Sequence, residues 1–184
     1  MISPDQAIQE TQSWIVNVVA GCNFCPFAAR EVKLDSIHYR VTDFVKPGPI
    51  LQALLDECRL LDTDPAVETG FVIITEGYQD FEDYLDLVEL AEKLLKKEKY
   101  EGVYQVASFH PEYRFEGAPP DDPANFTNRS MYPMLHLLRE ESIEKALKTF
   151  PNPDSIPEKN ITLARKKGFA AMEALRSSCK ISYR

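Results

Sequence analysis

The stretch GFVIIT at residues 70–75 is a short continuous run of apolar and β-branched residues. Such a run fits a central strand that is covered on both faces, as in a parallel sheet. In residues 37–44 the pattern alternates instead, which predicts a half-buried strand with Ile37, Tyr39 and Val41 on one face and His38, Arg40 and Thr42 on the other. Residues 103–109 are predicted to form a third strand.

Five further segments have apolar residues at helical spacing. They are residues 4–20, 50–61, 81–96, 131–150 and 157–175. Helices that separate strands favour parallel, right-handed connections. We therefore expect a single α/β domain over residues 1–184, with a small, mainly parallel three- or four-stranded sheet flanked by helices. An additional edge strand would come from around Leu34 or from residues 110–130.

Composition limits the class of protein and its partners. The 184-residue chain has a formal net charge of −8, which argues against nucleic acid and anionic membrane as partners. No apolar run reaches transmembrane length, and the polar N-terminal residues lack the order of a secretion signal. The four cysteines do not form a dense disulfide framework, so we expect a cytoplasmic protein. Oligomeric state is left open.

Residues 108–140 hold the candidate functional site, because polar loops carry function more often than scaffolds do. His110 directly follows the third strand, at the edge where parallel sheets bind ligands. On the predicted helix 131–150, one stripe extends from polar residues into the core: His136, Glu140, Ile143, Leu147 and Phe150. His110, His136 and Glu140 are thus predicted catalytic residues. A strand-capping His110 and a structural His136–Glu140 pair are the alternatives.

The same three residues match a two-histidine, one-carboxylate set that binds divalent metals. A divalent metal is therefore a candidate cofactor, although no dense ligand motif accompanies the set. Asp121 and Asp122 would add oxygen ligands, but an Asp-Asp-Pro run is more often a solvated turn.

Cys25 is a second catalytic candidate. Pro26 suits the first position of a short helix, which would place Cys25 at the N-cap, where a thiol has a lowered pKa. Such a thiolate beside an imidazole would be a nucleophile. Cys22 and Cys25 also form a C-x-x-C pair, which can be a redox pair or half of a zinc site. Zinc is not expected because no second C-x-x-C follows, and a thioredoxin fold is not expected because the pair follows a helix. A buried, inert thiol is the alternative.

Basic and polar residues of the same segment predict a site for an anion. Arg129 precedes a predicted helix N-terminus, where amides, a hydroxyl and a guanidinium meet. The predicted substrate-binding residues are Arg114, Asp122, Asn128, Arg129, Ser130 and Arg139. Arginines that bond loop carbonyls and acids are the alternative.

Several motifs together resemble the DUF1415 family of bacterial proteins, which also has plastid relatives. The resemblance spans essentially the whole chain and rests on CPFA at 25–28, ASFHPEYRF at 107–115, residues 122–125, NRS at 128–130 and YPMLHLLRE at 132–140. It implies that Cys25, His110, Arg129, His136, Arg139 and Glu140 belong to the family motif. It implies no activity. The chain departs from the family at Met131, where proline is usual, and at Cys22.

Two functions are therefore considered. The first is an enzyme, of undetermined class among hydrolases, transferases and metal-dependent enzymes, that acts on a small anionic metabolite through a His/Glu/Arg pocket. The second is a non-catalytic protein in which residues 110–140 form an architectural network and an outer surface binds a partner. Convergence of His110, His136 and Cys25 in one pocket would favour the first, and dispersal would favour the second.

Overall fold

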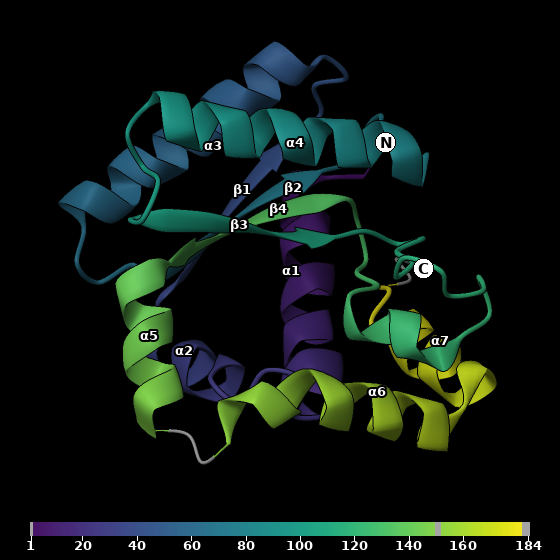
Figure 1. Cartoon of the computed structure of the whole chain (residues 1–184). Coiled ribbons are helices and arrows are strands. Elements are labelled where there is room, and N and C mark those ends of the chain that lie inside the picture. Colours follow the sequence, from purple (N-terminus) through teal and green to yellow (C-terminus); the bar gives the residue numbers. More distant parts are fainter. Residues whose placement is uncertain (1, 150–151, 182–184) are drawn as a thin grey trace.

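The computed structural model describes residues 2–149 and 152–181, which form a four-stranded sheet with helices on both faces (Figure 1). The strands are β1 (Ile37–Thr42), β2 (Thr69–Ile74), β3 (Tyr104–Phe109) and β4 (Met134–Arg139), in the order β1-β2-β4-β3. β1 and β2 are parallel, whereas β4 is antiparallel to both β2 and β3. Strands β1, β2 and β3 therefore point the same way, and their carboxyl ends meet at one edge.

Helices α3 and α4 cover one face of the sheet, and helices from both ends of the chain cover the other (Figure 1). The α-helices are α1 (Pro4–Trp14), α2 (Ala28–Leu34), α3 (Pro47–Thr63), α4 (Phe81–Lys97), α5 (Glu140–Thr149), α6 (Ile156–Lys167) and α7 (Phe169–Ser177). A π-helix, η1 (Ile15–Ala20), continues α1, and two short 3₁₀-helices are η2 (Pro123–Thr127) and η3 (Pro153–Ser155).

Alternation along the strands divides the apolar side chains between two cores. In β2, Val72 and Ile74 pack under α3 and α4, while Phe71 and Ile73 pack against α1 and the C-terminal helices. Every residue of β2 is buried, as the continuous run at 70–75 predicts.

Most of the predicted elements are confirmed. The strands at 37–44, 70–75 and 103–109 and the helices at 50–61 and 81–96 are present, and the predicted last helix is interrupted at Gly168, where α6 ends and α7 begins. The first predicted helix is present as α1 followed by η1. Residues 28–34 form α2 rather than an edge strand.

The predicted helix over residues 131–150 is wrong in its first half. Residues 134–139 form β4, because Leu135 and Leu137 bury on the α3–α4 face while Met134 buries on the opposite face. Only residues 140–149 are helical, as α5, and Phe150 lies outside the described residues. His136 and Glu140 therefore do not share a helical stripe.

The α/β class is confirmed, with a mixed sheet. One strand pairing is parallel and two are antiparallel, because the fourth strand inserts between β2 and β3 instead of adding at an edge. Among the described residues, no helix is long and apolar enough to cross a membrane.

Candidate functional site

His110 lies at the carboxyl edge of the sheet, as predicted, but both of its ring nitrogens are engaged. The residue is fully buried; Nε2 donates to the carbonyl of Tyr78 at 2.9 Å, and Nδ1 accepts from the amide of Glu112 at 3.0 Å. The ring packs on Phe81 and Tyr84 of α4. Burial lowers the pKa of His110 below its usual value. A neutral imidazole with two partners connects the loops here and leaves no nitrogen for a ligand.

His136 lies on the other face of the sheet. Its ring stacks on Phe71, with the centroids 3.9 Å apart, and Nε2 is 2.8 Å from the hydroxyl of Thr69. That hydroxyl donates to the carbonyl of Leu137, so Nε2 must donate to the hydroxyl. Burial lowers the pKa of His136 to about 3. The two imidazoles therefore lie on opposite faces and do not share a pocket.

Residues 111–130 are held by hydrogen bonds to backbone carbonyls. The guanidinium of Arg129 is buried and donates to the carbonyls of Tyr113 at 3.1 Å and Pro120 at 2.7 Å. Asn125 accepts from the amide of Phe115 and donates to the carbonyl of Pro119. The predicted anion-binding groups are thus engaged with their own loop, which is the alternative stated for them.

The other predicted substrate-binding residues also have partners within the protein. Asn128 donates to the carbonyl of Ser108, and the hydroxyl of Ser130 donates to the carbonyl of Tyr132. Asp122 pairs with Arg165 at 2.7 Å, and Arg114 pairs with Glu82 at 3.5 Å. Arg139 donates to the carbonyls of Leu61 and Val67, where α3 ends.

The predicted metal set is not assembled. Within residues 2–149 and 152–181, Glu140 begins α5 and bonds neither histidine, and no group of three or more metal-ligating side chains occurs. The roles predicted for His110, His136 and Glu140 in catalysis stay predictions, but they cannot rest on a shared cavity.

Cys25 precedes α2 without capping it, because Phe27 is the N-cap residue. Burial raises the pKa of its thiol, and the amides of Phe27 and Ala28 oppose that shift only in part. The predicted lowering of the pKa is therefore wrong. Cys22 and Cys25 are both free thiols, and Cys25 has no hydrogen bond to an imidazole among the described residues.

A His/Glu/Arg cluster exists elsewhere, on edge strand β1. Glu57 of α3 has a fully buried side chain; one carboxylate oxygen accepts from Nδ1 of His38 at 2.7 Å and the other from Nε of Arg40. The His38 and Arg40 side chains are 37% and 36% exposed. The buried carboxylate thus fixes two side chains that reach the surface.

This cluster could have been found in the sequence. His38 and Arg40 alternate with apolar residues on a predicted strand, so they share a face. Glu57 lies three residues after Leu54 and four before Leu61, within the buried stripe of α3. A carboxylate in an apolar stripe requires a partner, and the polar face of the neighbouring strand supplies it.

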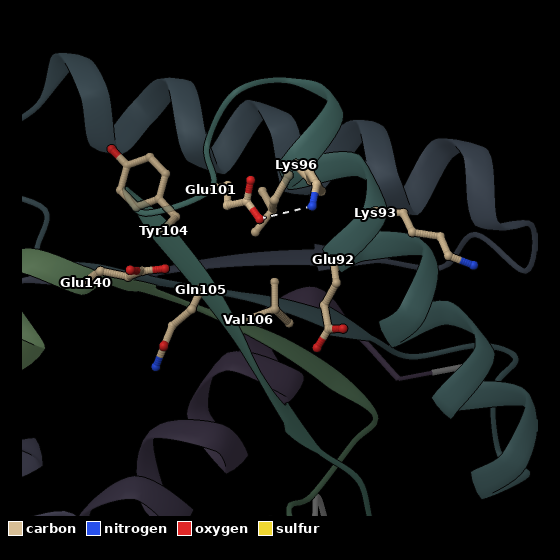
Figure 2. A pocket seen from close by; sticks show the side chains of 9 residues that line it. Glu92, Lys93, Lys96, Glu101, Tyr104, Gln105, Val106 and Glu140 are labelled. Carbon is tan, nitrogen blue, oxygen red and sulfur yellow. Dashed lines mark ion pairs between the residues drawn. The ribbon is translucent and has the colours of Figure 1, made fainter.

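A groove lies between α4 and the outer edge of β3, with a volume of about 440 Å³ (Figure 2). Its lining includes the apolar parts of Leu95, Tyr104 and Val106 together with several charged side chains. Lys96 pairs with Glu101 at 3.3 Å across the upper rim. Glu140 lines the groove at the end near Gln105.

Residues 6–174 match the family described as "Protein of unknown function (DUF1415)". The chain belongs to this family. Comparisons with curated proteins and with solved structures gave no match. For this DUF1415 member the match covers most of the chain and confirms the resemblance found in the motifs. Function must therefore be inferred from the geometry.

Proposed function

We propose that the protein is an interaction protein that binds an extended, basic segment of a partner by adding it as a strand to β3. The observation that carries the proposal is that β3 is an edge strand beside the groove under α4 (Figure 2). Peptide recognition by strand addition uses this combination of free backbone groups and side-chain pockets.

The outer edge of β3 has backbone groups free for pairing. The hydroxyl of Tyr84 joins the carbonyl of Met134 to the amide of Phe109, so the Phe109 amide points toward β4. Amide directions alternate along an antiparallel strand. The amides of Val106 and Ser108 therefore point outward, away from β4. The outward carbonyl of Ser108 accepts from the side chain of Asn128, so the open part of this edge is centred on Val106.

The groove beside this edge suits apolar and basic side chains. Val106 and the ring of Tyr104 offer an apolar floor between the strand and α4. Among the described residues, Glu92 and Glu140 have no ion-pair partner, whereas Lys96 is paired with Glu101 and Lys93 with Glu89. The charge left on the rim is thus negative, which favours lysine or arginine in the occupant.

A blocked heptapeptide that alternates lysine with valine is the probe. We expect saturable binding by isothermal titration calorimetry and weaker binding of the matched peptide that alternates glutamate with valine. The substitution Val106→Pro removes one outward amide, and proline is tolerated at such a position on an edge strand. It should weaken binding by at least about tenfold, since each 1.4 kcal/mol is a factor of ten.

Charge is tested by Glu92→Lys, with Glu98→Lys as the control, because Glu98 is exposed at the C-terminal end of α4 and does not line the groove. Only the first should weaken binding of the lysine peptide. Equal binding of both peptides, or unchanged binding by Val106→Pro, would refute the proposal. A concentration-dependent dimer that Val106→Pro abolishes would instead assign this edge to a second copy of the chain.

The dispersal of His110, His136 and Cys25 favours this function over an enzyme built on residues 110–140. The bonds of His110 to the loops and of His136 to the sheet support an architectural role for that segment. An enzyme acting on a small anion would need another constellation, and the chain offers one on β1.

A further inference from the structure

His38 and Arg40 are two residues apart on one face of the edge strand β1, and the same buried carboxylate holds both. We propose that they form a binding site for a small oxyanion that carries a hydroxyl group, such as a monoprotonated phosphate or a hydroxycarboxylate. Glu57 is the positioning residue of this site. The site is separate from the groove at β3, because β1 and β3 are opposite edges of the sheet.

The atoms that would contact the ligand are reached by solvent. Among the described residues, every buried side-chain nitrogen and oxygen has a hydrogen-bond partner. Nε2 of His38 and both Nη atoms of Arg40 have no partner in the described part of the chain, and both side chains are about one-third exposed. These nitrogens are therefore open to a ligand, while Nδ1 and Nε are occupied by Glu57.

The bonds to Glu57 set the hydrogen-bonding character of each open atom. A carboxylate only accepts, so the proton of a neutral His38 ring is on Nδ1 and Nε2 carries a lone pair. The Nη atoms of Arg40 are donors in a planar fork that matches two oxygens of a carboxylate or phosphate. The arrangement therefore binds anionic oxygens at Arg40 and accepts a hydrogen bond from a ligand hydroxyl at Nε2 of His38.

Spacing allows one small ligand to contact both side chains. Residues i and i+2 of a strand are about 6.6 Å apart along one face, and here the side chains converge on the two oxygens of Glu57. If the cluster were only a structural ion pair, Arg40 alone would compensate the buried charge of Glu57, and His38 would not be needed. An imidazole held at one nitrogen and open at the other is also the arrangement used in general acid–base catalysis.

The probe is inorganic phosphate, followed through the imidazole resonances in nitrogen–proton correlation spectra of the full chain. The His38 signals should shift saturably, and those of His110 and His136 should not, because the His110 ring is bonded at both nitrogens and the His136 ring stacks on Phe71 and bonds Thr69. Arg40→Gln should weaken phosphate binding by about tenfold or more, the effect of losing a charge-assisted fork. Arg59→Gln, on the exposed side of α3, is the matched control and should not change it.

The positioning role of Glu57 is tested through the tautomer of His38, which a structural role alone would not change. In Glu57→Gln the amide can also donate, so the nitrogen shifts of His38 should report a mixture of tautomers instead of protonation at Nδ1 alone. Arg40→Lys keeps the charge without the fork, and it should also weaken binding if Arg40→Gln does not fold. Shifts that chloride reproduces at equal ionic strength, or that both arginine variants retain, would overturn the proposal.

Discussion

Oε2 of Glu57 occupies the space into which a side chain on Gly70 would project. A Cβ at residue 70 would lie 2.7 Å from that oxygen. Glycine at this position of the buried strand β2 therefore leaves room for the carboxylate that holds His38 and Arg40.

The first prediction concerns this close approach. Gly70→Ala should lower the free energy of unfolding by about 1–3 kcal/mol, the usual cost of overpacking, and should shift the His38 resonances as Glu57 moves. Gly48→Ala in α3 is the control, because a Cβ there meets nothing within 4 Å. Chemical denaturation measures both. Equal stability of Gly70→Ala and the wild type would show that Glu57 moves without cost.

A pH dependence is predicted from His136. Burial lowers its pKa from 6.5 to about 3, so the unfolded state binds the proton more readily. Stability is then fully present above pH 6.5 and decreases as the pH falls from 6.5 toward 3, by at most about 1.4 kcal/mol per pH unit. Denaturation at pH 7 and pH 5 should show a smaller difference for His136→Gln than for the wild type. Parallel losses in the two proteins would show that the imidazole of His136 is not held neutral by the fold.

Thiol labelling should show whether Cys25 reacts because its thiol is accessible or because its pKa is lowered. Cys25 is partly exposed, while Cys22, Cys58 and Cys179 are buried, so Cys25 should react first with iodoacetamide. Burial raises its pKa above the ordinary value of 9, so the rate should keep increasing as the pH rises to 9 and beyond. A rate that is already maximal near pH 7 would indicate a thiolate and restore Cys25 as a candidate nucleophile.

Arg129 is predicted to stabilise the loop. Arg129→Met removes two bonds from a buried cation to carbonyls, and it should cost about 1.5–3 kcal/mol of stability. Arg114→Met is the control, because its side chain is 42% exposed and its loss should cost no more than about 0.5 kcal/mol. If both variants unfold at the same denaturant concentration as the wild type, the loop does not depend on Arg129.

Replacing Glu140 is not expected to change the stability of the protein, because Glu140 does not bond His136. The sequence pattern placed His136 and Glu140 on one stripe of a predicted helix. A structural pair there would have left the carboxylate of Glu140 without a partner when His136 was removed. In the structure the partner of His136 is Thr69, and Glu140 lines the groove at β3. Glu140→Gln should therefore weaken binding of the lysine–valine peptide and leave the unfolding midpoint unchanged.

Local pattern was sufficient for most of the fold and for the family. The buried run of β2, the alternation of β1 and the apolar spacing of α3 and α4 each reflect a side-chain period that the neighbouring sequence fixes. The position of His110 at the end of β3 also follows from the chain alone, because it is the next residue after a strand.

Tertiary structure decided the position of β4 and the surroundings of the predicted site residues. Residues 134–139 are β4 because an interior position between β2 and β3 satisfies their backbone on both sides, and no local period records that position. The face on which His136 lies depends on Thr69 and Phe71, which are more than sixty residues earlier in the chain. The carbonyls that hold Arg129 depend on how the loop folds back on itself. These contacts decide which polar side chains bond within the protein and which remain open to a ligand. Residue type and local spacing do not record them.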